Sequence, residues 1–352
     1  MAYSAIDKSS LNFNVLKWAG NDSNRTLTGV GFQPDAVWIK PLNLNYSWTV
    51  ADAVRGATGN GTYSGTVLLN SNSAPEGDTN GNGAITAFTS DGYTLTDGTS
   101  DFGRVNGSYN YVSWNWKANG AGSANTDGSL DSTVSVNTNA GFSIVKWHNN
   151  TGSVQTIGHG LGKVPKFIVM KVLSSTGSWN TYHDKIGNTH GLYINSDAGD
   201  ENNDAFWNDT SPTSTVFTTG TNGNLVNNHL VAYCFADVEG YQKIGEYKGN
   251  GLTDGQFIYT GFKPSLIIIK RSDTTKNWYA HDYKRAGYNP QNDYLSTNLS
   301  AVEGSYTEFD IYSNGFKLRG SGTGHNTSGA KYVYYAVGQS LVGSNDVPCT
   351  AR

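Results

Sequence analysis

The chain has 352 residues, of which 24 are Lys or Arg and 28 are Asp or Glu, giving a formal net charge of −4. This balance argues against a nucleic-acid-binding protein, and no apolar run approaches the ~18 residues of a membrane-spanning helix. Only 15% of the residues are charged, whereas 43 are Gly and 12% are aromatic. Such a composition is typical of β proteins with a neutral polar surface and an aromatic interior.

Residues 1–12 read as a polar arm, and residues 1–8 contain no apolar segment of a signal peptide. Cys234 lies within an apolar run and is predicted to be a core residue, while Cys349 lies near the C-terminus. Two such cysteines indicate no disulfide framework, so we expect folding in a reducing cytoplasm.

One motif occurs three times, at 30–40, 160–171 and 260–270. A glycine shortly precedes a proline, and an apolar run then ends in a lysine. In each copy the Lys lies six positions after the Pro, and a Trp lies fourteen positions after it. Two fixed offsets in three copies indicate three homologous units.

The apolar run of the motif predicts the central strand of each unit. Proline fixes φ at the entry to the strand, and consecutive apolar residues bounded by turn residues are typical of a strand buried on both faces. We therefore predict central strands at 37–39, 167–170 and 266–269. The Lys that follows is expected to mark where each strand returns to water.

Shorter signals surround each central strand. An alternating strand opens each unit, at 13–18, 142–147 and 241–247, and an aromatic strand closes it, at 111–116, 231–236 and 332–337. Asp91-Gly92 and Asn314-Gly315 are hairpin signals, whereas 216–220 departs from that pattern in the second unit. No stretch of eleven residues has helical periodicity.

These elements predict an all-β protein made of three tandem homologous antiparallel β-sandwich domains of jelly-roll or concanavalin-like type. Residues 1–120 form the first domain with its arm, 121–238 a linker and the second, 239–338 the third, and 339–352 a tail. The linker is assigned because residues 118–140 are almost all small or polar.

The repeated tryptophans, Trp48, Trp179 and Trp278, have two interpretations. Exposed, they would be stacking platforms for sugars; buried, they would fill the core. A Trp at constant offset in diverged units favours the core.

An Asp follows each Trp by four or five positions, as Asp52, Asp184 and Asp282, and Arg55 and Arg285 follow in two units. His183-Asp184 and His281-Asp282 suggest acid–base chemistry, but the first unit has Ala51 instead of His and no nucleophile recurs beside them. We expect a structural Asp that caps a turn or pairs with Arg.

Other polar segments give weaker signals. The segment 78–89 begins like a calcium loop, but Thr89 occupies the position that requires a bidentate Glu. The acidic segment 200–204 reads as solvated surface, and 158–162 is followed by a strand, which excludes a phosphate loop. We therefore assign no catalytic, cofactor-binding or metal-binding residue.

Four segments resemble one known family. They are the opening Met-Ala-Tyr-x-x-Ile-Asp-Lys, the Gly-Phe-x-Pro-x-x-Val-Trp-Ile-Lys core strand, the closing Tyr-Val-x-Trp-x-Trp-Lys, and the tail Ser-Leu-Val-Gly-Ser-Asn-Asp-Val-Pro. They are similar to a repeat-built family of virion structural proteins of marine bacteriophages, including cyanophages, often described as tail-fibre-like. The resemblance covers essentially the whole chain and implies a location in the virus particle, with no catalytic residues to carry over.

The resemblance implies a non-enzymatic tail fibre, spike or surface decoration component, assembled in the host cytoplasm and able to contact the host surface. A carbohydrate- or receptor-binding module is the alternative, and a polysaccharide depolymerase is the third. We expect no cofactor, no nucleic acid and no membrane insertion. Expected partners are other virion proteins, host glycan, and copies of the chain in a homotrimer, joined through the tail, whose Leu341, Val342 and Val347 are apolar.

Overall fold

The computed structural model describes residues 6–57, 63, 65–74, 83–97, 104–222 and 225–340. Across these residues the chain is built from antiparallel β-sheets, with one 3₁₀ turn, η1 (Ser9–Leu11), and two four-residue helices, α1 (Asp204–Trp207) and α2 (Tyr283–Ala286). The prediction of an all-β protein is confirmed. No helix in the described part of the chain is long and apolar enough to cross a membrane.

Unit 1 has a five-stranded sheet, β1-β8-β3-β4-β5, and a three-stranded sheet, β2-β7-β6. Its strands are β1 (Phe13–Ala19), β2 (Arg25–Leu27), β3 (Ala36–Pro41), β4 (Thr49–Asp52), β5 (Val67–Leu68), β6 (Ala84–Thr89), β7 (Gly92–Thr96) and β8 (Asn110–Trp116).

Unit 2 has an eight-stranded sheet, β16-β15-β14-β13-β18-β11-β10-β9, and the strand pair β12-β17. Its strands are β9 (Ser123–Asn125), β10 (Ser132–Asn137), β11 (Phe142–Asn149), β12 (Gln155–Gly158), β13 (Phe167–Val172), β14 (Asn180–His183), β15 (His190–Tyr193), β16 (Glu201–Asn202), β17 (Val216–Thr219) and β18 (Asn228–Phe235).

Unit 3 has two four-stranded sheets, β19-β26-β21-β22 and β20-β25-β24-β23. Its strands are β19 (Gln242–Lys248), β20 (Phe257–Tyr259), β21 (Pro264–Arg271), β22 (Trp278–Asp282), β23 (Gln291–Tyr294), β24 (Gly304–Tyr312), β25 (Gly315–Leu318) and β26 (Lys331–Gly338).

The predicted central strands are β3, β13 and β21. Each central strand pairs on one side with the closing strand of its unit, which is β8, β18 or β26. On the other side it pairs with the next strand in the sequence, which is β4, β14 or β22. All six residues of β3 are buried. Val37 and Ile39 face a core within unit 1, while Ala36 and Trp38 face a different and larger core. Two cores, one on each face of the sheet, explain why the apolar residues do not alternate with polar ones.

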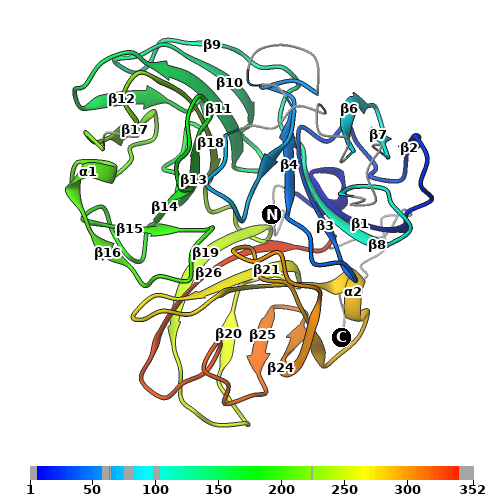
Figure 1. Cartoon of the computed structure of the whole chain (residues 1–352). Helices are drawn as coiled ribbons and strands as arrows, with labels where there is room; N and C mark the ends of the chain where they lie inside the picture. Colours follow the sequence, from blue (N-terminus) through cyan, green and yellow to red (C-terminus); the bar gives the residue numbers. More distant parts are fainter. Residues whose placement is uncertain are drawn as a thin grey trace.

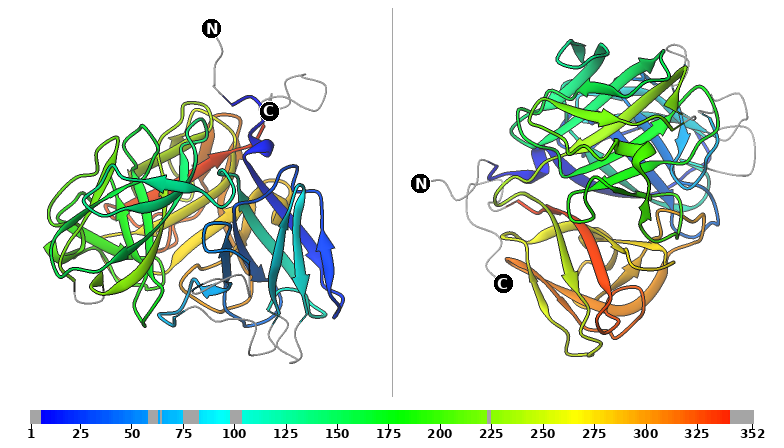
Figure 2. Two further views of the ribbon diagram at one scale, coloured as in Figure 1. Left: turned by 90° about the horizontal axis from the view of Figure 1, so that it is seen from above. Right: turned by 90° about the vertical axis from the view of Figure 1, so that its left-hand side faces the viewer.

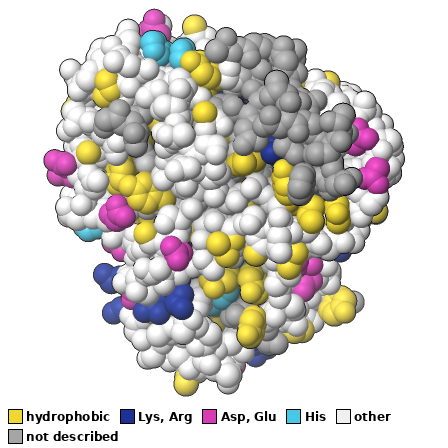
Figure 3. Space-filling view, viewed as in Figure 1, with side chains coloured by type: hydrophobic (Ala, Val, Ile, Leu, Met, Phe, Trp, Pro, Cys, Tyr) yellow, Lys and Arg dark blue, Asp and Glu magenta, His cyan; other side chains and the backbone are white. Residues whose placement is uncertain are grey.

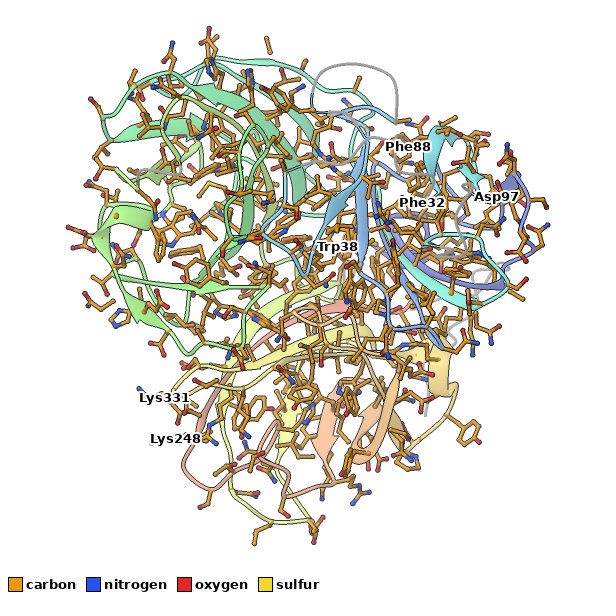
Figure 4. The ribbon with its side chains drawn as sticks, in the orientation of Figure 1. Phe32, Trp38, Phe88, Asp97, Lys248 and Lys331 are labelled. Carbon is orange, nitrogen blue, oxygen red and sulfur yellow. The ribbon has the colours of Figure 1, made fainter. Side chains whose placement is uncertain are left out.

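The larger core is shared by all three units, which are arranged around a common centre (Figure 1). Trp38, labelled in Figure 4, lies in this region. The rings of Trp116 and Phe235 are 6.1 Å apart, and those of Phe235 and Tyr335 are 4.9 Å apart, so aromatic contacts run from unit 1 through unit 2 to unit 3. We call this shared region the central core. Smaller cores lie inside each unit.

The linker predicted at the start of the second domain is wrong in part. Strands β9 and β10 lie within residues 118–140 and extend the large sheet of unit 2 at its edge. In β10, Val134 alternates with polar neighbours and is buried in the core of unit 2. The composition concealed β10 because a strand with one face in a core needs only alternate apolar residues, and in β10 these are two valines among small polar residues.

The surface seen in Figure 3 is mostly neither charged nor hydrophobic, as the composition predicts. The first and last described segments of the chain lie side by side (Figure 2). There the Ser10 backbone N–H donates to Ser340 Oγ at 3.1 Å, and the Gln339 N–H donates to the Lys263 carbonyl at 2.7 Å. The N-terminal arm and the beginning of the predicted tail therefore contact each other. Residues 341–352 and Cys349 lie outside the described residues.

Candidate functional site

The three repeated tryptophans are core residues, and each joins two units. Their exposed fractions are 0, 0 and 1% for Trp48, Trp179 and Trp278. Each indole Nε1 donates at 2.9 Å to a backbone carbonyl of another unit, that of Ser296, Leu68 and Tyr193 respectively. The interpretation as core residues is confirmed, and exposed stacking platforms at these positions are excluded.

The prediction that the motif lysines return to water is wrong. Lys40, Lys171 and Lys270 are all completely buried. Each ammonium donates at 3.1 Å to a carbonyl of another unit, that of Ser300, Asn72 and Asp197 respectively. Burial lowers the pKa of Lys40 to about 7 and that of Lys171 to about 8. Carbonyl acceptors are what keep a buried ammonium from being left without partners.

These contacts repeat with threefold regularity. Unit 1 donates to unit 3, unit 3 to unit 2, and unit 2 to unit 1, so the contacts close a ring. An Asn side chain fixes each acceptor segment, because its Oδ1 accepts from the backbone N–H of the Trp in its own unit: Asn70, Asn195 and Asn298. In every unit the carbonyl bound by Trp lies two positions before this Asn, and the carbonyl bound by Lys lies two positions after it.

The expected Asp–Arg pairing is confirmed in two units. Arg55 Nε lies 2.5 Å from Asp52 Oδ2, and Arg285 Nε lies 2.6 Å from Asp282 Oδ2, all fully buried side chains. Asp52 also accepts from the Tyr233 hydroxyl of unit 2 at 2.7 Å. These carboxylates are thus saturated structural acceptors.

In unit 2 the equivalent position, four after the Trp, holds His183. His183 Nε2 lies 3.2 Å from the Tyr334 carbonyl of unit 3, and burial lowers the pKa of His183 to about 4. Asp184 is instead partly exposed and pairs with Lys185 at 3.3 Å. The two members of this predicted His-Asp pair therefore face different surroundings.

His281 is buried in unit 3, and its Nε2 lies 3.0 Å from His325 Nε2. Burial, then the neighbouring His325, lowers the pKa of His281 well below its ordinary value. The Asp293 carbonyl lies 3.1 Å from His281 Nδ1 and can only accept, so Nε2 of a neutral His281 accepts from His325 Nε2. In the described ranges no three His, Cys, Asp or Glu side chains gather where they could hold a metal ion.

The other segments considered in the sequence lie in different parts of the structure and form no common site. The first positions of the 78–89 segment lie outside the described residues, and Thr89 ends β6. In the acidic 200–204 segment, Asn203 caps α1 by accepting from the Ala205 N–H at 3.0 Å. Gly158 ends β12 in a strand pair with β17, and Cys234 is buried as predicted.

A surface feature of unit 3 was not predicted. In β20 the side chains of Phe257 and Tyr259 point to solvent, with exposed fractions of 43 and 61%, while Ile258 between them is buried. Phe257 packs edge-on against Tyr312 at 6.0 Å and lies over Gly315, where a Cβ would be 2.7 Å from its ring. Phe257 therefore covers a bare stretch of sheet, whereas Tyr259 extends beyond it.

Tyr259 forms one wall of a cleft of about 340 Å³ between units 2 and 3. Asp237, Glu239 and Lys243 also line this cleft. Asp237 is held in place because its Oδ1 accepts from the Ile244 N–H at 2.8 Å and its Oδ2 accepts from Lys166 Nζ at 2.8 Å. An aromatic ring, a fixed carboxylate and a lysine thus converge on one concave surface, which is the strongest candidate site in the described residues.

Comparison with known proteins adds a family and no activity. No curated protein and no solved structure matches the chain. One family model, described as a domain of unknown function (DUF7483), matches residues 8–340. That match spans all three units and the first residues of the predicted tail, and the chain belongs to this family.

Proposed function

We propose that this protein is a non-enzymatic structural component of a bacteriophage particle, as a tail fibre, spike or surface decoration assembled in the host cytoplasm. The observation that carries the proposal is the closed ring of contacts. In all three units the motif Lys and the Trp donate hydrogen bonds to another unit, and the Asn holds the acceptor segment of its own unit in place. A repeat whose polar residues join the three units into one body fits a rigid structural component. The location in a phage particle is what the sequence resemblance implies.

We further propose that each unit is a jelly-roll or concanavalin-like sandwich. In unit 3 the first strand pairs with the last, β19 with β26, and the second pairs with the second-last, β20 with β25. Such nested pairing supports a jelly roll. The third strand departs from the nesting, since β21 pairs with β26 and β22.

The proposed partners are other virion proteins and further copies of the chain, with a homotrimer expected by analogy to fibres. The arm and the beginning of the tail lie together on one side of the molecule, which supports a single attachment side (Figure 2). The three units of one chain already surround a common centre, so a threefold partner would meet three similar surfaces (Figure 1).

Mass spectrometry and antibody labelling of purified particles from the phage that carries the gene test this proposal. The chain should be present in a fixed number of copies per particle, and labelled antibody should decorate one part of the particle surface. A chain found only in the infected cell lysate, and absent from purified particles, would contradict it.

A carbohydrate- or receptor-binding module is the second candidate function. The exposed Tyr259 beside the cleft between units 2 and 3 favours it, because an aromatic ring next to fixed polar groups is the usual composition of a binding pocket. Binding of the purified protein to an array of bacterial surface glycans tests this candidate, which can hold together with the first.

A further inference from the structure

We propose that the cleft between units 2 and 3 binds a neutral carbohydrate, with a pyranose ring stacked on Tyr259 and a hydroxyl donating to the carboxylate of Asp237. This inference rests on the second candidate function and assigns it a site and a ligand class. The C–H face of a pyranose is apolar and its rim is polar, which matches an aromatic ring flanked by hydrogen-bonding groups.

Comparing equivalent positions of the three units shows which residue types the fold itself requires. The buried residue of β20, Ile258, corresponds to Leu27 in β2 and Ile157 in β12, each of which pairs with an aromatic residue of the neighbouring strand. At the position after it, unit 1 has Thr28 and unit 2 has Gly158, where unit 3 has Tyr259. The sandwich therefore forms without an aromatic side chain at this position.

Phe257 makes the closer contacts with its own chain, whereas the ring of Tyr259 lies over Gly261, 3.6–3.8 Å from where a Cβ would be. The ring of Phe257 shields Gly315 and packs on Tyr312, so its apolar surface is partly used by the protein. The side chain of Tyr259 is 61% exposed and forms a wall of the cleft. Keeping a large exposed aromatic at a position where Thr and Gly suffice points to a ligand that contacts it.

The charges around the cleft favour a neutral ligand. The carboxylate of Asp237 is 2.8 Å from the ammonium of Lys166 and 3.8 Å from that of Lys243. Glu239 also lines the cleft, so two carboxylates offset the two ammonium groups and an anionic ligand would meet little unbalanced positive charge. A sugar hydroxyl needs only an acceptor, and the side chain of Asp237, with 24% of its surface exposed, is oriented by the Ile244 N–H to supply one.

The volume of the cleft sets the size of the ligand. About 340 Å³ lies at the lower end of the range for small-molecule sites, roughly 300–1,000 Å³, and suits one or two sugar rings. The inference is thus a site for a mono- or disaccharide unit of a longer neutral glycan, whose remaining rings extend into solvent.

The test uses the full chain on an array of neutral and anionic bacterial glycans, followed by titration calorimetry with the best neutral oligosaccharide. Tyr259→Thr, which installs the residue type found at this place in unit 1, should weaken binding at least about fivefold, the loss of one aromatic stacking contact. Tyr259→Phe should keep the affinity, and Asp237→Asn should weaken it. Tyr306→Ala is the matched control, since Tyr306 is 67% exposed on β24 outside the cleft lining.

The outcomes separate the site from the function. Binding of neutral glycan that falls with Tyr259→Thr and not with Tyr306→Ala supports the proposal. Neutral glycan binding that is unchanged by Tyr259→Thr would overturn the site and leave the second candidate function standing. Failure of the parent chain to bind any glycan would overturn both, and selective binding of anionic glycans would overturn the assigned ligand class.

Discussion

The ammonium of Lys40 lies 3.1 Å from the carbonyl oxygen of Ser300, a residue 260 positions later in the chain. The same ammonium also donates to the Pro41 carbonyl of its own unit at 2.9 Å. Equivalent lysines make equivalent contacts in the other two units. A buried cation at the end of each central strand therefore connects that strand to another unit.

Replacing one of these lysines by Met should destabilise the protein. In Lys171→Met the Asn72 and Gly177 carbonyls lose their buried donor, and the expected cost is about 2 kcal/mol in the free energy of unfolding. Denaturant titration measures this change. Lys248→Met is the control, because Lys248 is exposed at the outer end of β19 (Figure 4) and should change the stability by no more than about 0.5 kcal/mol. Equal stability of Lys171→Met and the parent would contradict the structural role of the buried ammonium.

Ile268→Asp tests the central strand of unit 3. Ile268 is 1% exposed and faces the central core, so the variant places an unpaired carboxylate among apolar side chains of more than one unit. A loss of about 3 kcal/mol or more is expected. Thr26→Asp, on the exposed side of β2, should be tolerated. If Ile268→Asp melts like the parent, the strand does not face a core.

The central strands could be predicted because their signal is local: an apolar run between a turn and a charged residue. The burial of that charged residue could not be predicted from the sequence. A Lys after an apolar strand ordinarily reaches water, and only the approach of a distant carbonyl makes its burial favourable. Nothing near Lys40 in the sequence indicates Ser300.

The Asn residues of the ring escaped prediction for a related reason. The spacing between Trp and Asn differs in every unit, 48 to 70, 179 to 195 and 278 to 298, because the loops between them differ in length. Variable spacing removes the periodic signal that identified the Lys and the Trp. Tyr259 was not predicted because the equivalent positions of the other units hold Thr28 and Gly158, so this position has no repeated signal.

Stability should fall as the pH is lowered from about 6.5 toward 4. Burial lowers the pKa of His183 to about 4 from an ordinary 6.5, so in this window the unfolded chain binds a proton that the folded chain does not. Linkage then makes the free energy of unfolding decrease as the pH falls. The slope is proportional to the difference in bound protons between the unfolded and folded states, and His183→Gln should reduce that difference by up to one. Above pH 7 the free energies of unfolding of the two proteins should change with pH in parallel. An unchanged slope in the variant would show that His183 does not stay neutral in the folded state.

Deleting residues 341–352 tests the proposed role of the tail. Gln339 and Ser340 contact the chain's own unit 3 and arm, and they are kept in this variant. The truncated chain should unfold at the temperature of the parent and lose self-association in sedimentation velocity. A truncated chain that assembles like the parent would exclude the tail as the assembly contact, and a parent that is monomeric at all concentrations would exclude the homotrimer.

Differential scanning calorimetry of the parent and of Lys171→Met tests most directly whether the three units form one body around the central core. A shared core and a closed ring of contacts predict one unfolding transition, with equal calorimetric and van't Hoff enthalpies. The substitution should move that whole transition to lower temperature. Separate transitions for the units, with Lys171→Met shifting only one of them, would contradict the account.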